Sequence, residues 1–199
     1  MLKDFGAKVI SIEYTSPVSE EGGEGIFNQK SSKLCLNLKN RKISKFVLEK
    51  IIPRVHIVIE SYRPEVMERF GLGPAEVHQA NKKVIYVRIS GYGHSPTAGD
   101  LKFSAGRDLN FLAASGLLSQ FRRNSKNSVP SFPGNILTYY ASGSLYVFNL
   151  IMQALISGSH HTVIDCALTT NAAYLGQPAL LNAHFVRPIL EPGKRANNF

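Results

Sequence analysis

The sequence predicts an α/β fold, in which a Rossmann-like parallel sheet is flanked by helices. Short apolar runs rich in β-branched residues alternate with segments whose apolar residues have helical spacing. Apart from Lys33–Leu38, which alternates, the apolar runs are continuous, which is typical of strands buried on both faces. The chain has 199 residues, of which 44% are hydrophobic. We expect one domain over residues 1–199, with a sheet half over 1–95 and a helical half over 104–185.

Strands and helices alternate through the first half. The predicted strands are Ala7–Glu13, Lys33–Leu38, His56–Ser61 and Val84–Gly93. The predicted helices cover residues 40–55, 63–73 and 74–83. Asn40 is the expected N-cap of the first helix, and Pro64 suits the first turn of the second. Gly71 or Gly73 is the expected stop of that second helix.

The second half is richer in helix. A helix is predicted over residues 107–121, capped from Ser104, and a long apolar helix over 136–158. A strand over 162–168 is expected to run into a last helix over 169–185, with Asp165 as its cap. The polar segments around residues 14–32 and 122–135, and the tail from 186, carry no predicted element.

Charge and motifs limit the partners. The formal net charge is +9 and the isoelectric point is about 9.6, which favours an anionic partner. No nucleic-acid-binding signature accompanies this charge, so we expect a phosphorylated small molecule rather than nucleic acid. We expect no membrane span and find no secretory signal pattern. His160 and His161 lack a third neighbouring ligand, so no metal site is expected.

Three further groups of residues carry expectations. Cys35 and Cys166 lie in strand-like runs, and we expect both to be buried free thiols in a reducing compartment. In a parallel sheet, ligands bind at the carboxyl ends of strands, where "ESYRP" and "SGYGHSP" stand. Gly91 and Gly93 in the second segment would let the backbone approach a ligand closely.

Three stretches carry a family resemblance: "IESYRPEVMERFGLGPAEVHQANKKVIYVRISGYGHSP", "AGRDLNFLAASG" and "VIDCAL". They resemble the class III CoA-transferase family, and within it the alpha-methylacyl-CoA racemase branch. The resemblance extends from Leu2 to about Leu181. It implies a Rossmann-like α/β domain completed by a smaller domain, an interlocked homodimer, and a CoA thioester as ligand without a covalently bound cofactor.

The resemblance also implies site residues. The CoA-contacting positions would be Leu36, Asn37, Leu38, Lys39, Tyr62, Arg63 and Arg69. The thioester end would be lined by Gly106, Arg107, Asp108, Leu109, Asn110 and Phe111. Arginines on such loops can hold phosphate oxygens with paired N–H donors.

Both positions that carry the family's chemistry are substituted. Racemases of this family use a His and an Asp on opposite faces of the α-carbon. Here Arg107 and Tyr139 occupy those positions. An arginine cannot take a proton in a protein, and a phenol donates one more readily than it removes one. Asp108 matches an Asp that the family already has, so we expect it to cap the helix or to pair with an arginine.

Other departures concern the loops and the ends. Tyr14 stands where the family has an arginine, and "QKSS" replaces a basic loop. Relative to the family, we expect the first strand and the smaller domain to be missing. A fragment or mispredicted gene product, a decayed paralogue, and a partner of a longer chain all stay open.

Three functions follow from the resemblance. The first is a racemase-like protein that acts on or binds 2-methylacyl-CoA thioesters by α-proton transfer. In it, Arg107 polarises the thioester carbonyl and Tyr139 donates a proton. The alternatives are a non-catalytic CoA-ester-binding or dimerisation module, and, more weakly, a CoA transferase. The partner would be a second copy or a longer relative. The family implies a mitochondrial or peroxisomal location, with the cytoplasm as the alternative and no visible targeting signal.

Overall fold

The computed structural model describes residues 1–14, 32–121, 129–134 and 136–185. Its contacts divide the chain into two compact units. Unit 1 comprises Met1–Val58, Glu65–Tyr86 and His160–Thr162, and unit 2 comprises Ile59–Pro64, Val87–Ser159 and Val163–Phe199. The tail from residue 186 and most of the two polar loops lie outside the described residues. The expected single domain with its two halves stays a prediction.

Unit 1 begins with two of the expected strands, each shorter than predicted. Strand β1 (Ile10–Glu13) pairs in parallel with β2 (Ser32–Cys35). Leu36–Lys39 therefore follow β2 rather than end it. All four residues of β2 are exposed, including Cys35, so the expectation that this thiol is buried is wrong.

The first predicted helix is confirmed. Helix α1 (Arg41–Phe46) continues through a π-helical turn, Val47–Ile51, and a 3-10 turn, Ile52–Arg54. The Asn40 side chain accepts a hydrogen bond from the Lys42 N–H, as an N-cap does. The apolar face of this segment packs into the core of unit 1, whose buried members are Val47, Ile52, Met67, Leu72, Val77, Val84 and Tyr86.

Two short helices follow in unit 1, α2 (Val66–Arg69) and α3 (Pro74–Ala80). The prediction that Pro64 lies in the first turn of α2 is wrong. Glu65 has a left-handed φ of 70°, which interrupts helical backbone between Pro64 and Val66. Gly71, with φ 71°, follows the helix and ends it as predicted.

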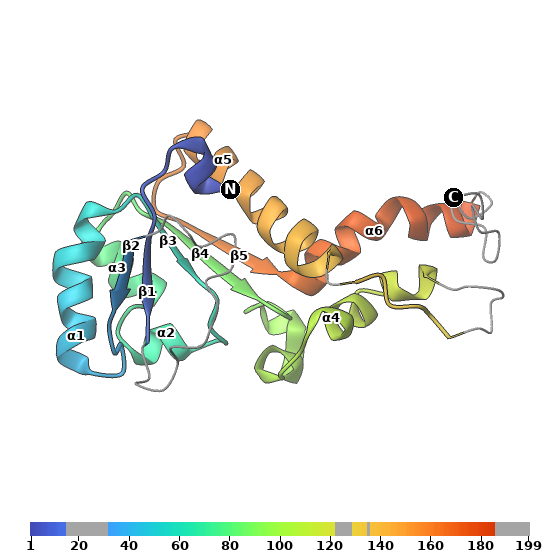
Figure 1. Cartoon of the computed structure of the whole chain (residues 1–199), viewed down its shortest axis with the longest axis horizontal. Helices are drawn as coiled ribbons and strands as arrows, with labels where there is room; N and C mark the ends of the chain where they lie inside the picture. Colours follow the sequence, from blue (N-terminus) through green and yellow to red (C-terminus); the bar gives the residue numbers. More distant parts are fainter. Residues whose placement is uncertain (15–31, 122–128, 135, 186–199) are drawn as a thin grey trace. The chain divides into compact units, whose positions relative to one another are not determined.

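The remaining strands form a second sheet. Its order is β3 (Ile57–Glu60), β4 (Ile85–Ser90) and β5 (Thr162–Ala167), and each strand begins in unit 1 and ends in unit 2. The α/β class with parallel strands and flanking helices is confirmed (Figure 1). The described strands form two sheets rather than the one expected. Strands β1 and β2 pair with each other, and neither of them pairs with β3, β4 or β5.

Helices dominate unit 2. After β4 come a 3-10 segment, Pro96–Phe103, then α4 (Asp108–Ala114) and a 3-10 turn, Leu117–Gln120. The helix predicted over 107–121 is therefore shorter, because Gly116 has a left-handed φ of 79°. Ser104 is not its cap: it closes the preceding 3-10 segment, and Arg107 is the N-cap residue of α4.

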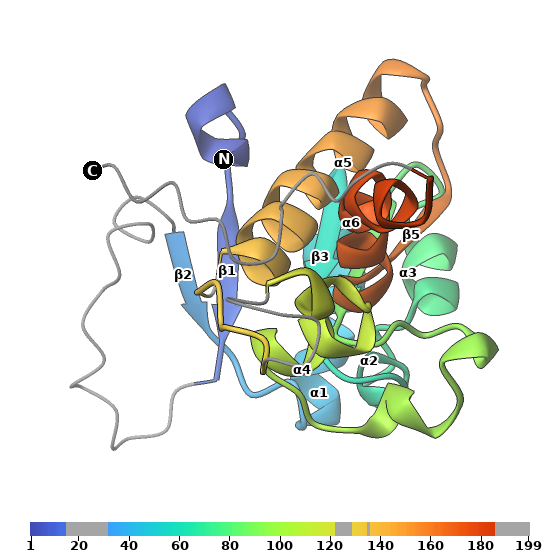
Figure 2. The same ribbon diagram turned by 90° about the vertical axis from the view of Figure 1, so that its right-hand side faces the viewer.

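The long apolar helix is confirmed in two parts, a π-helical segment η6 (Leu137–Leu145) and α5 (Tyr146–Ile156). The last helix, α6 (Leu168–Phe185), packs against η6 and α4 within unit 2 (Figure 2). The Asn171 amide of α6 donates a hydrogen bond to the Ser142 carbonyl of η6 at 2.9 Å. This bond ties η6, which lines the site described below, to the last helix.

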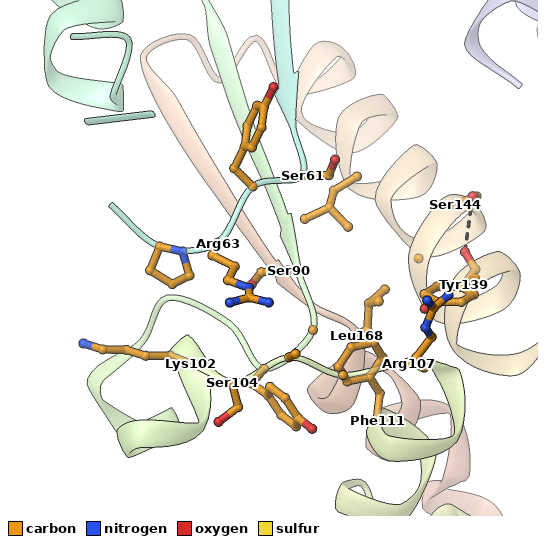
Figure 3. Close-up of a pocket in the computed structure, with 18 residues that line it drawn as sticks. Ser61, Arg63, Ser90, Lys102, Ser104, Arg107, Phe111, Tyr139, Ser144 and Leu168 are labelled. Carbon is orange, nitrogen blue, oxygen red and sulfur yellow. Dashed lines mark hydrogen bonds between the residues drawn. The ribbon is translucent and has the colours of Figure 1, made fainter. Parts of the chain in front are cut away.

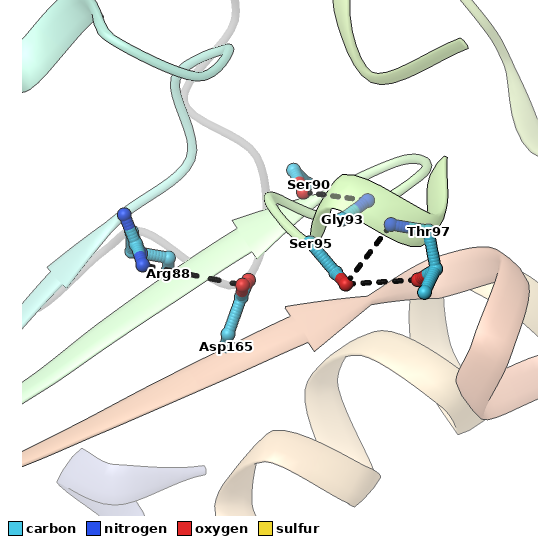
Figure 4. A network of polar contacts seen from close by, with 6 residues as sticks. All are labelled: Arg88, Ser90, Gly93, Ser95, Thr97 and Asp165. Atoms are coloured by element: carbon cyan, nitrogen blue, oxygen red, sulfur yellow. Dashed lines mark hydrogen bonds and ion pairs between the residues drawn. The ribbon is translucent and has the colours of Figure 1, made fainter. Parts of the chain in front are cut away.

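Polar contacts join β4 to β5 and order the segment that follows β4 (Figure 4). Arg88 of β4 lies 4.0 Å from the Asp165 carboxylate of β5. Asp165 is inside the strand, so the prediction that it caps α6 is wrong. The Thr169 N–H and hydroxyl both donate to the Gly91 carbonyl instead, at 3.0 and 2.8 Å.

The second cysteine, the length of the helices and the metal-ligating side chains can each be described. Cys166 is a buried free thiol, as predicted. Within the described ranges, no helix is long and apolar enough to cross a membrane. The same part of the chain contains no cluster of three metal-ligating side chains, and the His161 ring stacks on that of His78 at 4.1 Å.

Candidate functional site

Unit 2 contains an open pocket with a volume of about 530 Å³, which is in the range of small-molecule sites (Figure 3). The chain segments that line it are far apart in sequence: the exit of β3, the exit of β4, the loop before α4, η6 and the start of α6. The lining residues are Ser61, Tyr62, Arg63, Pro64, Ile89, Ser90, Gly91, Tyr92, Lys102, Ser104, Ala105, Gly106, Arg107, Phe111, Tyr139, Gly143, Ser144 and Leu168.

The exit of β3 is held by a buried carboxylate. Glu60, which is 6% exposed, accepts a hydrogen bond from the Tyr62 N–H at 2.7 Å. This contact bends the chain directly after the strand and brings Tyr62 and Arg63 to the pocket wall. Both residues are exposed there, and both stand at the carboxyl end of a strand, where the sequence predicted a ligand.

Two glycines make room for the Phe111 ring. A Cβ at Gly91 would lie 2.2 Å from a Phe111 ring carbon, and one at Gly106 would lie 2.4 Å from it. Gly91 itself lines the pocket, and close approach of a ligand to Gly91 and Gly93 stays a prediction. The space at Gly91 is filled by Phe111, and Gly93 has a left-handed φ of 88° and donates its N–H to the Ser90 hydroxyl.

The main chain of Arg107 is fixed while its side chain is exposed. Its N–H donates to the Asn110 side-chain oxygen at 2.9 Å, which is half of a capping box. The guanidinium lines the pocket. Within the described residues it forms no ion pair and no hydrogen bond. It therefore keeps its N–H donors available to a ligand.

Asp108 lies beneath the pocket wall. It is 1% exposed, and one carboxylate oxygen accepts a hydrogen bond from the Tyr139 N–H at 3.2 Å. The expected helix-capping role or arginine pair is wrong, because the hydrogen bond that this carboxylate accepts comes from η6 and not from the N-terminus of α4 or from an arginine. The other carboxylate oxygen and the hydroxyl of the fully buried Thr138 have no hydrogen-bond partner in the described part of the structure.

The main chain of Tyr139 forms hydrogen bonds through both its N–H and its carbonyl group. Besides the bond to Asp108, its carbonyl accepts a hydrogen bond from the Ser144 hydroxyl at 3.3 Å. Its ring meets that of Phe111 edge to face at 6.4 Å. Figure 3 shows Arg107 and Tyr139 at the same end of the pocket. Arg107 and Tyr139 therefore line one pocket although they lie on separate segments of the chain.

The pocket lining is cationic. Three of the lining residues carry positive charge, Arg63, Lys102 and Arg107, and none of the lining residues carries a carboxylate. The lining also contains serine hydroxyl groups and aromatic rings, among them Ser90, Ser104 and Phe111 (Figure 3). Such a surface is suited to an anionic ligand that also has an apolar part.

The structure brings part of the predicted site together. Tyr62, Arg63, Gly106, Arg107, Phe111 and Tyr139 line the pocket. Leu109 is exposed on α4 but is not among the lining residues, and Asn110 serves as the cap partner of Arg107.

Other predicted residues belong to unit 1. Arg69 ends α2, and the Lys39 ammonium lies 5.9 Å from the Tyr14 ring centre. The Asn37 side chain accepts a hydrogen bond from the Lys39 N–H. A ligand-binding role for Leu36–Lys39 and Arg69 stays a prediction.

Several lining residues were not predicted as site residues, among them Lys102, Ser104 and Leu168. Lys102 and Ser104 lie in the segment just before "AGRDLNF", so their nearness to that motif was a usable signal. Leu168 ends the "VIDCAL" stretch and starts α6. Its place in the pocket depends on the return of β5 to the sheet, which no local pattern shows.

Comparison with known proteins agrees with these features. The model of CoA-transferase family III matches residues 1–198. The chain belongs to CoA-transferase family III. Alpha-methylacyl-CoA racemase is 35% identical over 178 residues in both Mus musculus and Homo sapiens. Each match covers 88% of this chain and 44% of the relative. The human succinyl-CoA:glutarate CoA-transferase is 28% identical over 185 residues, covering 85% of this chain and 41% of the relative.

Solved structures share the fold of this family III chain. A CaiB/BaiF family protein from Brucella suis superposes with a TM-score of 0.71 at 20% identity, covering 98% of this chain and 55% of that one. The protein Rv3272 from Mycobacterium tuberculosis gives a TM-score of 0.74 at 22% identity, with 92% and 51% covered. The chain spans about half the length of the relatives and structures it matches, so it is a partial version of that fold.

Proposed function

We propose that this chain binds an acyl-CoA thioester in the unit 2 pocket and supports proton exchange at the α-carbon. The observation that carries the proposal is the meeting of Arg63, Arg107 and Tyr139, from three distant segments, on the wall of one pocket. An acyl-CoA combines anionic phosphates with an apolar chain, and the lining offers cations together with aromatic and aliphatic side chains.

Arg107 would act as a fixed cation beside the thioester carbonyl. Removal of an α-proton places negative charge on that oxygen, and a positioned cation stabilises such charge. The guanidinium itself cannot accept the proton. The described lining residues offer no carboxylate or imidazole either, so in this proposal solvent in the open pocket accepts the departing proton.

Tyr139 would return a proton to the α-carbon. Its phenol carries an O–H group that can donate, its ring packs edge to face with Phe111, and its main chain forms two hydrogen bonds. The hydroxyl then regains a proton from solvent. Exchange of the α-hydrogen with water is the expected net result.

The substrate class rests on the relatives. The mouse and human relatives are alpha-methylacyl-CoA racemases, so we propose 2-methylacyl-CoA thioesters as the ligands of this chain. A homodimer, or a dimer with a longer relative, is proposed on the same basis, as is a peroxisomal or mitochondrial location. Because the chain spans less than half of these racemases, the activity of the whole protein is also a proposal.

Deuterium wash-in tests the proposed function. The chain is incubated with a 2-methylacyl-CoA in heavy water, and the mass of the acyl group is followed. We expect exchange that is at least tenfold slower in Tyr139→Phe, because general acid catalysis contributes about 10²–10⁴-fold. Tyr140→Phe is the matched control, since Tyr140 neighbours Tyr139 on η6 without lining the pocket. No exchange, while a full-length relative exchanges in the same buffer, rejects the catalytic part.

A further inference from the structure

Unit 1 contains a strongly basic helical segment, none of whose residues lines the pocket of unit 2. It covers residues 41–54, which are α1 and the π-helical and 3-10 turns that continue it. Five of these 14 residues are positively charged, against 23 of 199 in the whole chain. They are Arg41, Lys42, Lys45, Lys50 and Arg54, and all five are exposed. Positive charge is therefore concentrated on this segment beyond what its length explains.

The fold presents these cations to solvent while the apolar side of the segment packs inward. Val47 and Ile52 are buried members of the core of unit 1. Glu49 is the one acidic residue of the segment, and its carboxylate lies 3.7 Å from the Lys45 ammonium. Glu49 also lines a groove together with Glu76 of α3. One carboxylate cannot neutralise five cations, so the segment keeps a net positive charge at neutral pH.

An aromatic ring stands among the cations. Phe46 is 50% exposed, although the next residue, Val47, is buried. Lys42 and Lys50 lie four residues before and after it, about one helical turn away. We call Phe46 and the five cations together the basic face. Surface-binding helices combine these same groups, because lysine and arginine reach the lipid headgroups while an aromatic ring enters the interface.

An anionic lipid surface suits the basic face better than an acidic protein or a nucleic acid does. Three of the five cations are lysines, and lysine is depleted in protein–protein interfaces. The sequence carries no signature of a nucleic-acid-binding module. A bilayer surface requires no such module and no fixed set of donors, only positive charge held within a Debye length of its headgroups.

We infer that the basic face of unit 1 binds the surface of membranes that contain anionic phospholipids. The cations would lie over the headgroups, and the Phe46 ring would enter the interface between headgroups and acyl chains. Association would be reversible and would weaken as salt screens the charges. The inference goes beyond the proposed function and does not depend on it, because it requires neither a ligand in the pocket nor proton exchange.

Sedimentation with vesicles tests the charge dependence. We expect the chain to bind vesicles of phosphatidylcholine with about 30% phosphatidylserine at least tenfold more tightly than vesicles of phosphatidylcholine alone. High salt should abolish the difference. Lys42→Gln/Lys50→Gln should weaken binding to the anionic vesicles roughly tenfold or more, since two lysine–headgroup attractions are lost. Lys82→Gln/Lys83→Gln is the matched control, because it removes the same charge from exposed lysines of unit 1 outside the basic face.

A tryptophan probe tests whether the ring meets the bilayer. The chain contains no tryptophan, so Phe46→Trp introduces a single reporter. Its emission should shift to the blue on anionic vesicles, because the ring leaves water. Phe5→Trp is the control: Phe5 is 73% exposed in unit 1 but lies outside the basic face, so its emission should stay unchanged. Circular dichroism should show that every variant is folded.

Three results would overturn the inference. The first is binding of the unmodified chain that is absent or equal for the two kinds of vesicle. The second is equal weakening by the two double variants, which would assign binding to net charge alone. The third is an unshifted Phe46→Trp emission combined with tighter binding to a DNA duplex than to the anionic vesicles, which would assign the face to a nucleic acid. Each of these results leaves the proposed function standing, because deuterium wash-in is measured without vesicles.

Discussion

Arg107 and Asp108 are neighbours in sequence but have different surroundings. The Arg107 main chain is held by Asn110 while its side chain enters the pocket. Asp108 turns the other way, is 1% exposed, and accepts a hydrogen bond from Tyr139. Arg107 is the N-cap residue with extended backbone and Asp108 is the first residue of α4, so the two side chains leave the main chain in different directions.

At this residue, we predict that Asp108→Ala lowers the free energy of unfolding by about 1–3 kcal/mol, because it removes the acceptor of a buried N–H. Asp108→Asn should cost less, since its amide oxygen can still accept from Tyr139. Urea unfolding followed by circular dichroism measures both. The exposed Asp100→Ala is the control and should change little. Equal losses for the Ala and Asn variants would argue against the hydrogen bond as the cause.

At the scale of elements, the connection between β4 and α4 shapes the pocket. The strand ends at Ser90, and the following Gly91 leaves the space that the Phe111 ring of α4 occupies. The Phe111 ring in turn lies edge to face with the rings of Tyr92 and Tyr139, at distances between ring centres of 5.1 and 6.4 Å. One helix thereby orders aromatic rings from two other segments around the pocket.

A second contact between elements involves α3 and the turn before β5, both in unit 1. The His78 ring, 6% exposed, lies 3.1 Å from the Val84 carbonyl and stacks on the His161 ring. Burial lowers the pKa of His78, the nearby His161 lowers it further, and the hydrogen bond to Val84 opposes the shift. The folded chain therefore holds this ring neutral below the pH at which the unfolded chain protonates it.

We predict that stability is lost as the pH falls below about 6.5 and through the lower folded-state pKa, because only the unfolded chain then binds the proton. For this one group, the free energy of unfolding should change by no more than about 1.4 kcal/mol per pH unit. Unfolding midpoints measured from pH 7.5 to 5 should show the loss. The slope should be smaller in His78→Gln and unchanged in His160→Gln, which keeps the stacked pair. An unchanged slope in His78→Gln would contradict this assignment.

At the scale of the whole molecule, the two cysteines report on the two units. Cys35 in unit 1 is exposed, whereas Cys166 in unit 2 is 1% exposed. Burial raises the pKa of the Cys166 thiol to about 11, the hydrogen bond with Asn171 lowers it, and Asp165 raises it. Thiolate is the reactive form, so Cys166 should be protected both by its pKa and by its packing.

We therefore predict that a thiol reagent at pH 8 modifies one cysteine rapidly in the folded chain and both in guanidinium chloride. Absorbance of the released thiol follows the reaction. Cys35→Ser should abolish the rapid phase, and Cys166→Ser should leave it intact. Rapid modification of both thiols in the folded chain would show that unit 2 opens readily under these conditions.

Much of the fold followed from local patterns. Apolar periodicity predicted each of the described strands within a few residues, and Asn40 and Gly71 were predicted as helix boundaries. These features depend on residues close in sequence, whose conformational preferences act locally. Predictions that depended on distant neighbours fared worse. Asp165 pairs with Arg88 rather than capping α6, and the exposure of Cys35 depends on what covers its strand.

The element order, the basic charge and the motifs of CoA-transferase family III can be read from the sequence alone. The meeting of Arg63, Arg107 and Tyr139 in one pocket, the addition of Lys102, and the support that Asp108 gives to the wall all come from tertiary packing. Motifs and periodicity reside in consecutive residues, which a sequence displays directly. A pocket is made by side chains tens of residues apart, and their meeting depends on how strands and helices pack.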